Sequence, residues 1–306
     1  MSKIYIACLL LFVSFSSKMQ AQQAAHYTQY YYNMQILNPA YVGVKSDLSI
    51  VLLQRQQWVG IEGAPKTNTF SINGRTQNGL GIGTTVINDK IGLAESTNIN
   101  IDAAYTIATS YYGRVSVGIK GGLTLFTNKL AQGITPDNDV YLSTKGRFPT
   151  AGFGGLYYND KFYIGLSLPN LLKFSSFKTN DTFSESNGVS NKNYFLTGGS
   201  IFHVSETLKF KPSAIFKYTP SLPISFDVNG NFTLNDQFEI GFSYRFKKSI
   251  SALAMFVISE KVKIGYAYDY QLNNLGDNFN SHEIILSLNL NLDRDHRWLY
   301  HHFCCP

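Results

Sequence analysis

The sequence has few cysteines, few charges and no long apolar run after its first residues. Cys304 and Cys305 are adjacent near the C-terminal end, and Cys8 is the third cysteine. The body of the chain therefore has no pair that would support a disulfide-stapled fold. Charged residues make up 15% of the chain, against about 25% in ordinary soluble domains. The basic residues are scattered, so nothing predicts a nucleic-acid partner.

Motifs of the common enzyme classes are also missing. The sequence contains no G-x-S-x-G, no H-E-x-x-H and no P-loop. The run from Gly79 to Gly83 has alternating glycines, but it lies in a strand-like stretch with no helix after it, so it predicts no phosphate site. The tail after Leu292 holds histidines and cysteines without the usual spacing of metal ligands. A membrane-interface tail is the other reading of that segment. We predict no catalytic, cofactor-binding or metal site.

The first residues have the pattern of a secretory signal. Lys3 precedes a nearly continuous apolar run from Ile4 to Phe15, which is too short to span a bilayer as a helix. Small residues then lead to a plausible cleavage point after Ala21. We therefore predict that residues 1–21 are a signal peptide and that the protein is exported.

From about residue 46 the apolar residues repeat with a period of two. Ile99, Ile101 and Tyr105 alternate with polar residues such as Asn98 and Asp102, which indicates a strand with one apolar face. Aromatic residues make up 14% of the chain. An exported chain with short alternating segments and no long apolar run is typical of strands that face lipid on one side.

Segments of this kind recur along the chain and predict about fourteen strands. They cover residues 46–57, 67–76, 78–88, 95–108, 113–127, 148–158, 161–169, 193–204, 207–218, 222–234, 237–247, 249–258, 261–271 and 281–292. Short turns after the even-numbered segments and longer connections after most odd-numbered ones are typical of an outer-membrane barrel. We predict an all-β, antiparallel, up-and-down transmembrane β-barrel over residues 46–292, followed by a C-terminal tail, 293–306. A soluble sandwich or lipocalin-like barrel is the alternative.

The polar face of these strands carries both glycines and charges. Gly79, Gly81 and Gly83 share one face, which indicates either strong curvature or a filled lumen that approaches the wall closely. The charged residues predicted to face the lumen carry both signs, which favours an interior ion-pair network over an open polar channel. They are Asp102, Lys120, Lys209, Lys211, Lys217, Asp227, Glu239, Arg245, Lys263 and Asp269.

The stretch before the first strand is unusual for a free tail. Residues 29–43, QYYYNMQILNPAYVG, contain four tyrosines and no charge. Asn38 precedes Pro39 and is therefore biased to an extended conformation, so the chain turns there. Tyrosine suits a surface that is apolar on one side and wet on the other. We predict that residues 22–45 form a periplasmic or lumenal segment that plugs or lines the barrel; an anchor at the membrane interface is the alternative.

Several blocks of the sequence closely resemble one family. These blocks are HYTQY at 26–30, NPAYVG at 38–43, RQQWVGIEGAPKT at 55–67, NDKIG at 88–92 and SHEI at 281–284. They resemble the PorP/SprF family over essentially the whole mature chain. The resemblance implies an outer-membrane component of the type IX secretion system of Bacteroidetes, linked to gliding motility. It also implies partners: other type IX secretion components and secreted adhesins with a type B C-terminal domain. The tail from Asp293 departs from the family pattern.

The function expected from the sequence is therefore non-catalytic. The protein would support export or cell-surface attachment of a secreted protein; a passive porin-like channel and a structural scaffold between the outer membrane and periplasmic machinery are the alternatives. The residues expected to bind a partner or shape the motif are Tyr30, Asn38, Pro39, Tyr41, Trp58, Gly60, Gly63 and Pro65.

Overall fold

The computed structural model describes most of the chain from Thr28 to Leu290. The described residues are 28–44, 48–76, 78–129, 144–172, 177–179, 182–184, 192–220, 222–259, 261–272 and 280–290. The predicted signal peptide and C-terminal tail lie outside them.

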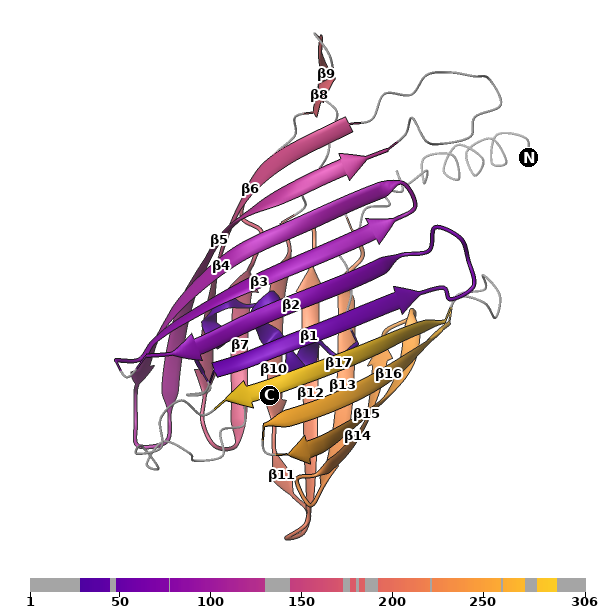
Figure 1. The fold of residues 1–306 in the computed structure, drawn as a ribbon. Coiled ribbons are helices and arrows are strands. Elements are labelled where there is room, and N and C mark those ends of the chain that lie inside the picture. Colours follow the sequence, from indigo (N-terminus) through magenta and orange to yellow (C-terminus); the bar gives the residue numbers. More distant parts are fainter. Residues whose placement is uncertain are drawn as a thin grey trace, which may run out of the picture.

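These residues form a closed antiparallel β-barrel of fourteen strands (Figure 1). The strands of the wall are β1 (Leu48–Gln57), β2 (Lys66–Arg75), β3 (Leu80–Ile91), β4 (Ala94–Ala108), β5 (Arg114–Asn128), β6 (Thr144–Tyr158), β7 (Phe162–Leu168), β10 (Tyr194–Ser200), β12 (Leu208–Tyr218), β13 (Ser225–Leu234), β14 (Phe238–Arg245), β15 (Ser249–Ser259), β16 (Val262–Gln271) and β17 (Ser281–Leu290). β11 (Phe202–His203) continues β10 along β12. β8 (Phe177–Thr179) and β9 (Thr182–Ser184) form a separate hairpin.

Two pairings complete the wall and leave no open edge. β1 pairs with β17, from Leu48 opposite Leu290 to Gln57 opposite Ser281. β10 pairs with β12 and so bridges the two halves of the sheet. Closure matters because an unpaired strand edge in a bilayer would leave backbone groups without hydrogen-bond partners. The predicted fold class is confirmed.

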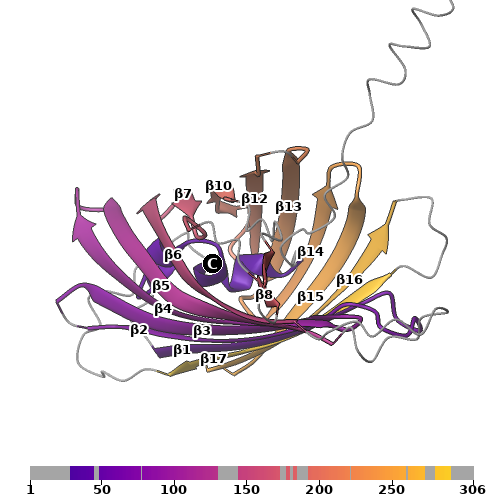
Figure 2. The same ribbon diagram turned by 90° about the horizontal axis from the view of Figure 1, so that it is seen from above.

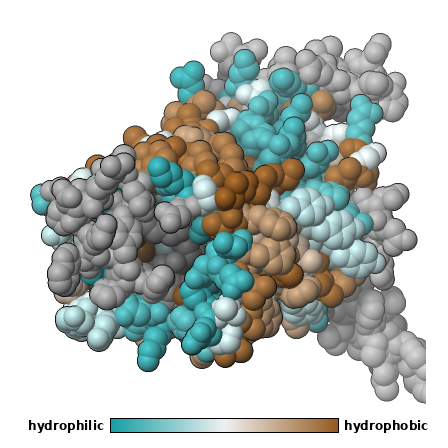
Figure 3. All heavy atoms as spheres, turned by 60° about the horizontal axis from the view of Figure 1, so that its bottom comes forward, coloured by the Kyte–Doolittle hydropathy of each residue, from teal (hydrophilic) through white to brown (hydrophobic). Residues whose placement is uncertain are grey.

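The alternation along each strand separates an apolar outside from a polar inside. On β5, Ile119 is 64% exposed and its neighbour Lys120 is 6% exposed. On β14, Phe242 is 59% exposed and Ser243 is 4% exposed. Figure 3 shows apolar side chains in a continuous area between hydrophilic ones. The wall therefore presents an apolar surface outward, as a bilayer requires.

The connections differ in length between the two ends of the barrel. The end where β1 finishes carries the longest connections, among them 129–143 and 169–193, and the opposite end carries only short turns such as 159–161 and 235–237. Outer-membrane barrels place short turns in the periplasm and long loops outside the cell. We call the first end the long-loop end and the second the turn end, and we expect the long-loop end to be extracellular.

One hairpin is longer than the sequence predicted. β3 and β4 pair as far as Ile91 opposite Ala94, so only Gly92 and Leu93 connect them. The predicted segments ended at 88 and began again at 95, because the polar residues there break the apolar alternation. Hairpin hydrogen bonds continue past the apolar zone, since the ladder joins backbone groups whatever the side chains are.

Arginine introduced at mid-wall tests the lipid-facing surface. Phe242→Arg would place a charge near the middle of β14 on the outer face, and we expect it to lower the free energy of unfolding by about 2–4 kcal/mol. Phe246 is 51% exposed in the turn just after β14, and Phe246→Arg should cost about 0–1 kcal/mol. Urea unfolding in lipid vesicles gives both values. Equal costs would contradict the assignment of this face to the bilayer.

Candidate functional site

The described part of the N-terminal segment, residues 28–44, lies inside the barrel (Figure 2). It forms three single turns of 3-10 helix, η1 (Tyr30–Tyr32), η2 (Met34–Ile36) and η3 (Pro39–Tyr41). Asn38 is extended, with φ −142° and ψ 113°, and its side chain accepts a hydrogen bond from the Ala40 backbone N–H. Pro39 then starts η3 with its fixed φ and no donor to satisfy. Asn38 and Pro39 together therefore turn the chain, as the sequence predicted.

The apolar core of the protein lies between this segment and the inner wall. Tyr30 and Met34 are each 4% exposed and Val42 is fully buried. The wall residues that pack in the same cluster come from both sides of the barrel, and they include Val51, Leu53, Leu156, Ile215 and Ile285. A lumen filled by apolar contacts of this kind is a packed interior, so the segment is a plug. We call residues 28–44 the plug from here on.

Glycines on the inner wall let the plug backbone approach the strands. A Cβ at Gly118 of β5 would lie 2.5 Å from the Ala40 nitrogen. A Cβ at Gly81 would overlap the Val42 carbonyl oxygen, and one at Gly154 would overlap the Asn38 side chain. Any side chain at these positions would therefore displace the plug. Of the two readings of the glycine face, the filled lumen is the one that these contacts support.

Polar side chains of the wall hold the plug by its backbone. The Glu283 carboxylate accepts hydrogen bonds from the Thr28 and Gln29 backbone N–H groups at 2.6 and 2.8 Å. Lys120 Nζ donates to the carbonyl oxygens of Gln35 and Ile36, each at 3.2 Å. Ser167 Oγ donates to the Leu37 carbonyl at 2.8 Å. The plug is thus bound as a peptide, along its length.

The strongest of these anchors is a buried charge cluster at the first residue of the plug. Arg55 of β1 donates to Asp269 Oδ2 of β16 at 2.6 Å and also to Glu283 of β17. Thr28 Oγ1 donates to Asp269 and accepts from Arg55. The side chains of Arg55, Asp269 and Glu283 are 1–2% exposed. Asp269 was predicted to face the lumen, whereas Arg55 and Glu283 were missed.

Further ion pairs line the lumen and confirm the predicted interior network. Lys211 pairs with Glu239 at 2.9 Å, and Arg245 pairs with Asp227 at 3.0 Å. The plug joins this network, because Tyr32 Oη donates to Glu239 at 2.6 Å. Burial raises the pKa of the Tyr32 phenol well above its usual value, and the Glu239 carboxylate raises it further. The hydroxyl therefore stays protonated as a donor.

The residues named from the sequence fall into two separate groups. Tyr30, Asn38, Pro39 and Tyr41 are buried in the plug. Trp58, Gly60 and Gly63 lie in the connection between β1 and β2 at the long-loop end, all with positive φ, and Pro65 is buried just before β2. They do not meet in one site.

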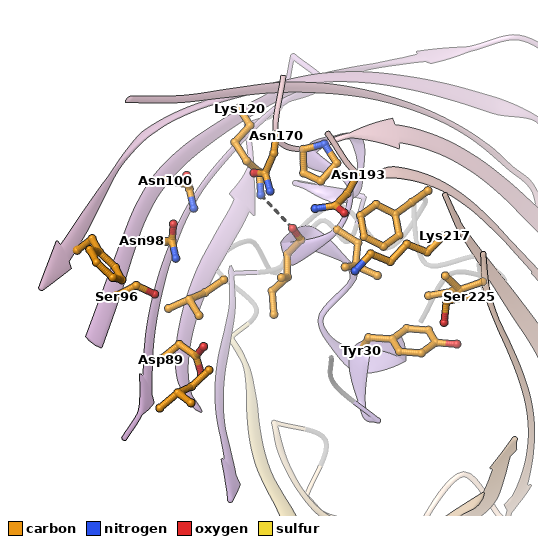
Figure 4. A pocket seen from close by; sticks show the side chains of 18 of the residues that line it. Tyr30, Asp89, Ser96, Asn98, Asn100, Lys120, Asn170, Asn193, Lys217 and Ser225 are labelled. Carbon is orange, nitrogen blue, oxygen red and sulfur yellow. Dashed lines mark hydrogen bonds between the residues drawn. The ribbon is translucent and has the colours of Figure 1, made fainter. Parts of the chain in front are cut away.

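A cavity of about 530 Å³ lies inside the barrel between the plug and the long-loop end (Figure 4). Ile36 and Leu37 of the plug contribute to its lining. The wall contributes residues from the middle and the long-loop ends of several strands, among them Asn98, Asn100, Lys120, Asn193 and Lys217. Sequence reasoning did not find this cavity, because it depends on how far the plug fills the lumen.

The described residues hold no group of three or more side chains suited to bind a metal ion. Within the same residues no helix is long and apolar enough to cross a membrane.

Comparison with known proteins decides the family. The model of the family described as type IX secretion system membrane protein PorP/SprF matches residues 19–288, which is most of the chain. The chain belongs to the PorP/SprF family. This PorP/SprF protein is a membrane component of the type IX secretion system, and its closed barrel with an apolar outer face places it in the outer membrane. No curated protein sequence matches it.

Solved barrels of other families resemble this PorP/SprF protein at low identity. The Acinetobacter baumannii outer membrane protein Omp33 is 6% identical, with a TM-score of 0.47 over 80% of this chain and 99% of that one. A Pseudomonas aeruginosa FadL homologue is 8% identical, with a TM-score of 0.46 over 81% and 89%. The KdgM porin is 11% identical, with a TM-score of 0.39 over 79% and 99%.

Two adjacent glycines of β6, Gly154 and Gly155, test whether the plug must lie this close to the wall. The Asn38 side chain beside Gly154 is fixed by bonds to the Gly155 carbonyl, at 3.1 Å, and the Ala40 N–H, at 2.9 Å. Gly154→Ala should therefore cost about 1–3 kcal/mol of stability through overpacking and should expose the plug to chymotrypsin. A Cβ at Gly155 meets nothing within 4 Å, so Gly155→Ala should leave both unchanged. Equal behaviour of the two variants would contradict the packing.

The buried charge cluster gives a second test. Arg55→Met leaves two buried carboxylates without their cation, and we expect a loss of about 3–5 kcal/mol. The control is Lys209→Met, because Lys209 pairs at 2.7 Å with Asp236, whose side chain is 63% exposed. That change should cost about 0–1 kcal/mol. Urea unfolding measures both, and a small loss for Arg55→Met would show that the cluster does not hold the plug.

Proposed function

We propose that this protein is a non-catalytic partner-binding component of the secretion system. In this role it supports the export or cell-surface attachment of a secreted protein, such as a gliding adhesin with a type B C-terminal domain. Family membership supports the secretion role. The adhesin, the signal peptide and the link to gliding come from the sequence resemblance and belong to the proposal.

The plug is the structural feature that best supports the proposed binding role. It contacts strands around the barrel, from Glu283 on β17 through Lys120 on β5 to Ser167 on β7. A segment held at so many points fills the lumen at mid-height. A protein whose lumen is filled is better suited to hold a partner than to conduct solutes.

The two alternatives make different demands on the structure. A porin-like channel requires a continuous aqueous path, and the apolar cluster between plug and wall lies across that path. A scaffold would engage periplasmic machinery through the turn end, where the connections are only a few residues long. The cavity at the long-loop end favours a partner outside the cell or in transit to it.

Purification from native outer membrane tests the proposal. We expect an exported protein to co-purify and the purified barrel to show little conductance in planar bilayers. Pro39→Gly loosens the turn that seats η3 against Gly118, so it should reduce the amount of partner displayed on the cell surface. The barrel of that variant should keep its heat-dependent shift in gel migration. Steady conductance with no co-purifying protein would support the channel instead.

A further inference from the structure

The cavity between the plug and the long-loop end carries an unusual set of hydrogen-bond donors. Asn98 and Asn100 project from β4, and Asn193 lies opposite them, just before β10 (Figure 4). In each case a threonine hydroxyl of the wall donates to the amide oxygen: Thr124 to Asn98, Thr150 to Asn100 and Thr219 to Asn193. The orientation of each amide is fixed by that bond.

Each amide therefore keeps its NH₂ group for another partner. Among the described residues, the Nδ2 atoms of Asn98, Asn100 and Asn193 donate to no acceptor. Donors from two sides of one cavity suit a ligand rich in acceptor oxygens. Lys217 adds positive charge; its ammonium lies 5.7 Å from the centre of the Phe195 ring and extends toward the middle of the cavity in Figure 4.

Two acidic residues of the cavity lie near the long-loop end and already have donors. Asp89 is close to the end of β3 and accepts from Thr67 at 2.6 Å. Glu95 is the second residue of β4 and accepts from Asn88 at 2.9 Å. Asp227 lies deeper, opposite Ile215; its Oδ2 accepts from Arg245, and its Oδ1 has no hydrogen-bond partner among the described residues. Along β3 and β4, the donors of Asn98 and Asn100 therefore lie deeper than the acceptors Asp89 and Glu95.

The rest of the lining distinguishes a peptide from a sugar. Apolar side chains cover the floor and much of the wall, among them Ile36, Leu37, Ile87, Phe126 and Ile215. A sugar has a hydroxyl group on most ring carbons and only small apolar faces, so it would leave much of this aliphatic surface unmatched. A peptide offers apolar side chains together with backbone carbonyls.

The plug shows that this lumen already binds a peptide in the same way. Wall side chains hydrogen-bond to its backbone, as Lys120 does to Gln35 and Ile36 and Ser167 does to Leu37. The donors of Asn98, Asn100 and Asn193 continue this arrangement above the plug.

We propose that this cavity receives an extended peptide segment of the exported partner, with a carboxylate leading into the donors of Asn98, Asn100 and Asn193. The inference rests on the proposed function and names where the partner binds. The carboxylate is either a chain terminus or an acidic side chain.

Site-specific photo-crosslinking in native membranes locates the partner. A photo-reactive residue at Ser96, which lines the cavity, should yield an adduct that mass spectrometry identifies as a peptide of an exported protein. The same residue at Ile101, which is on the outer face of β4 and 62% exposed, should yield no such adduct. A partner that co-purifies but gives no adduct at Ser96, or an adduct with a glycan there, overturns this inference alone. Absence of any co-purifying exported protein overturns the proposed function and this inference together.

Introducing negative charge tests the donors without losing the threonine bonds. Asn98→Asp with Asn193→Asp keeps an oxygen for each threonine hydroxyl and places carboxylates where the donors were. Like charges at an interface are strongly unfavourable, so binding of the cross-linked peptide sequence, made synthetically, should fall about tenfold or more. Asn159→Asp, in a turn at the opposite end where Oδ1 accepts from Lys161 and Phe162, should bind like the wild type.

Variants of the same peptide identify the source of the carboxylate. Fluorescence anisotropy with the purified barrel would compare three peptides: unmodified, amidated at the C-terminus, and with Asp and Glu replaced by Asn and Gln. Loss of binding on amidation assigns a chain terminus, and loss on side-chain replacement assigns an acidic residue. Equal binding of all three peptides, or unchanged binding by the barrel with Asn98→Asp and Asn193→Asp, overturns the proposal.

Discussion

The structure depends on the contact between the Glu283 carboxylate and the backbone of Thr28 and Gln29. That carboxylate is buried, so its charge is tolerable only because Arg55 and two backbone N–H groups surround it. The plug therefore supplies hydrogen bonds that the wall needs, and the wall supplies the acceptor that fixes the start of the plug. Neither is complete without the other, and the filled lumen and the cavity above it follow from this mutual dependence.

The strands of the wall were predicted from the sequence with little error, because a bilayer requires the outward-facing residues of each strand to be apolar. Outward residues such as Ile101, Ile119 and Phe242 had to be apolar, and the period of two revealed them. The ends of strands were less certain, as at Ile91 and Ala94, where pairing continues beyond the apolar zone. The turn at Asn38 and Pro39 was also predictable from local backbone restrictions.

The interior was only partly predictable, because its chemistry depends on contacts across the barrel. Arg55 was missed because β1 is apolar on both faces: Val51 and Leu53 point inward against the plug, so alternation gave no inner face. Glu283 and Ile285 are two residues apart on β17, so their side chains point to the same face. Glu283 could therefore have been predicted to face the lumen from the alternation along that strand. The free donors of Asn98 and Asn193 could not be predicted from the sequence, because the orientation of each amide is set by a threonine from a neighbouring part of the wall.

The charge cluster also joins the two ends of the wall. Arg55 belongs to the first strand and Glu283 to the last, and these two strands form the seam where the sheet meets itself. The cluster is therefore complete only when the first and last strands are paired and Thr28 is in place. Thr28 precedes the whole wall in the chain, yet it contacts Asp269 and Glu283 of the last two strands. Closure of the barrel and seating of the plug therefore share one cluster: a barrel closed without its plug would keep the Arg55 ion pairs but would lose the Thr28 and Gln29 N–H donors that also satisfy Glu283.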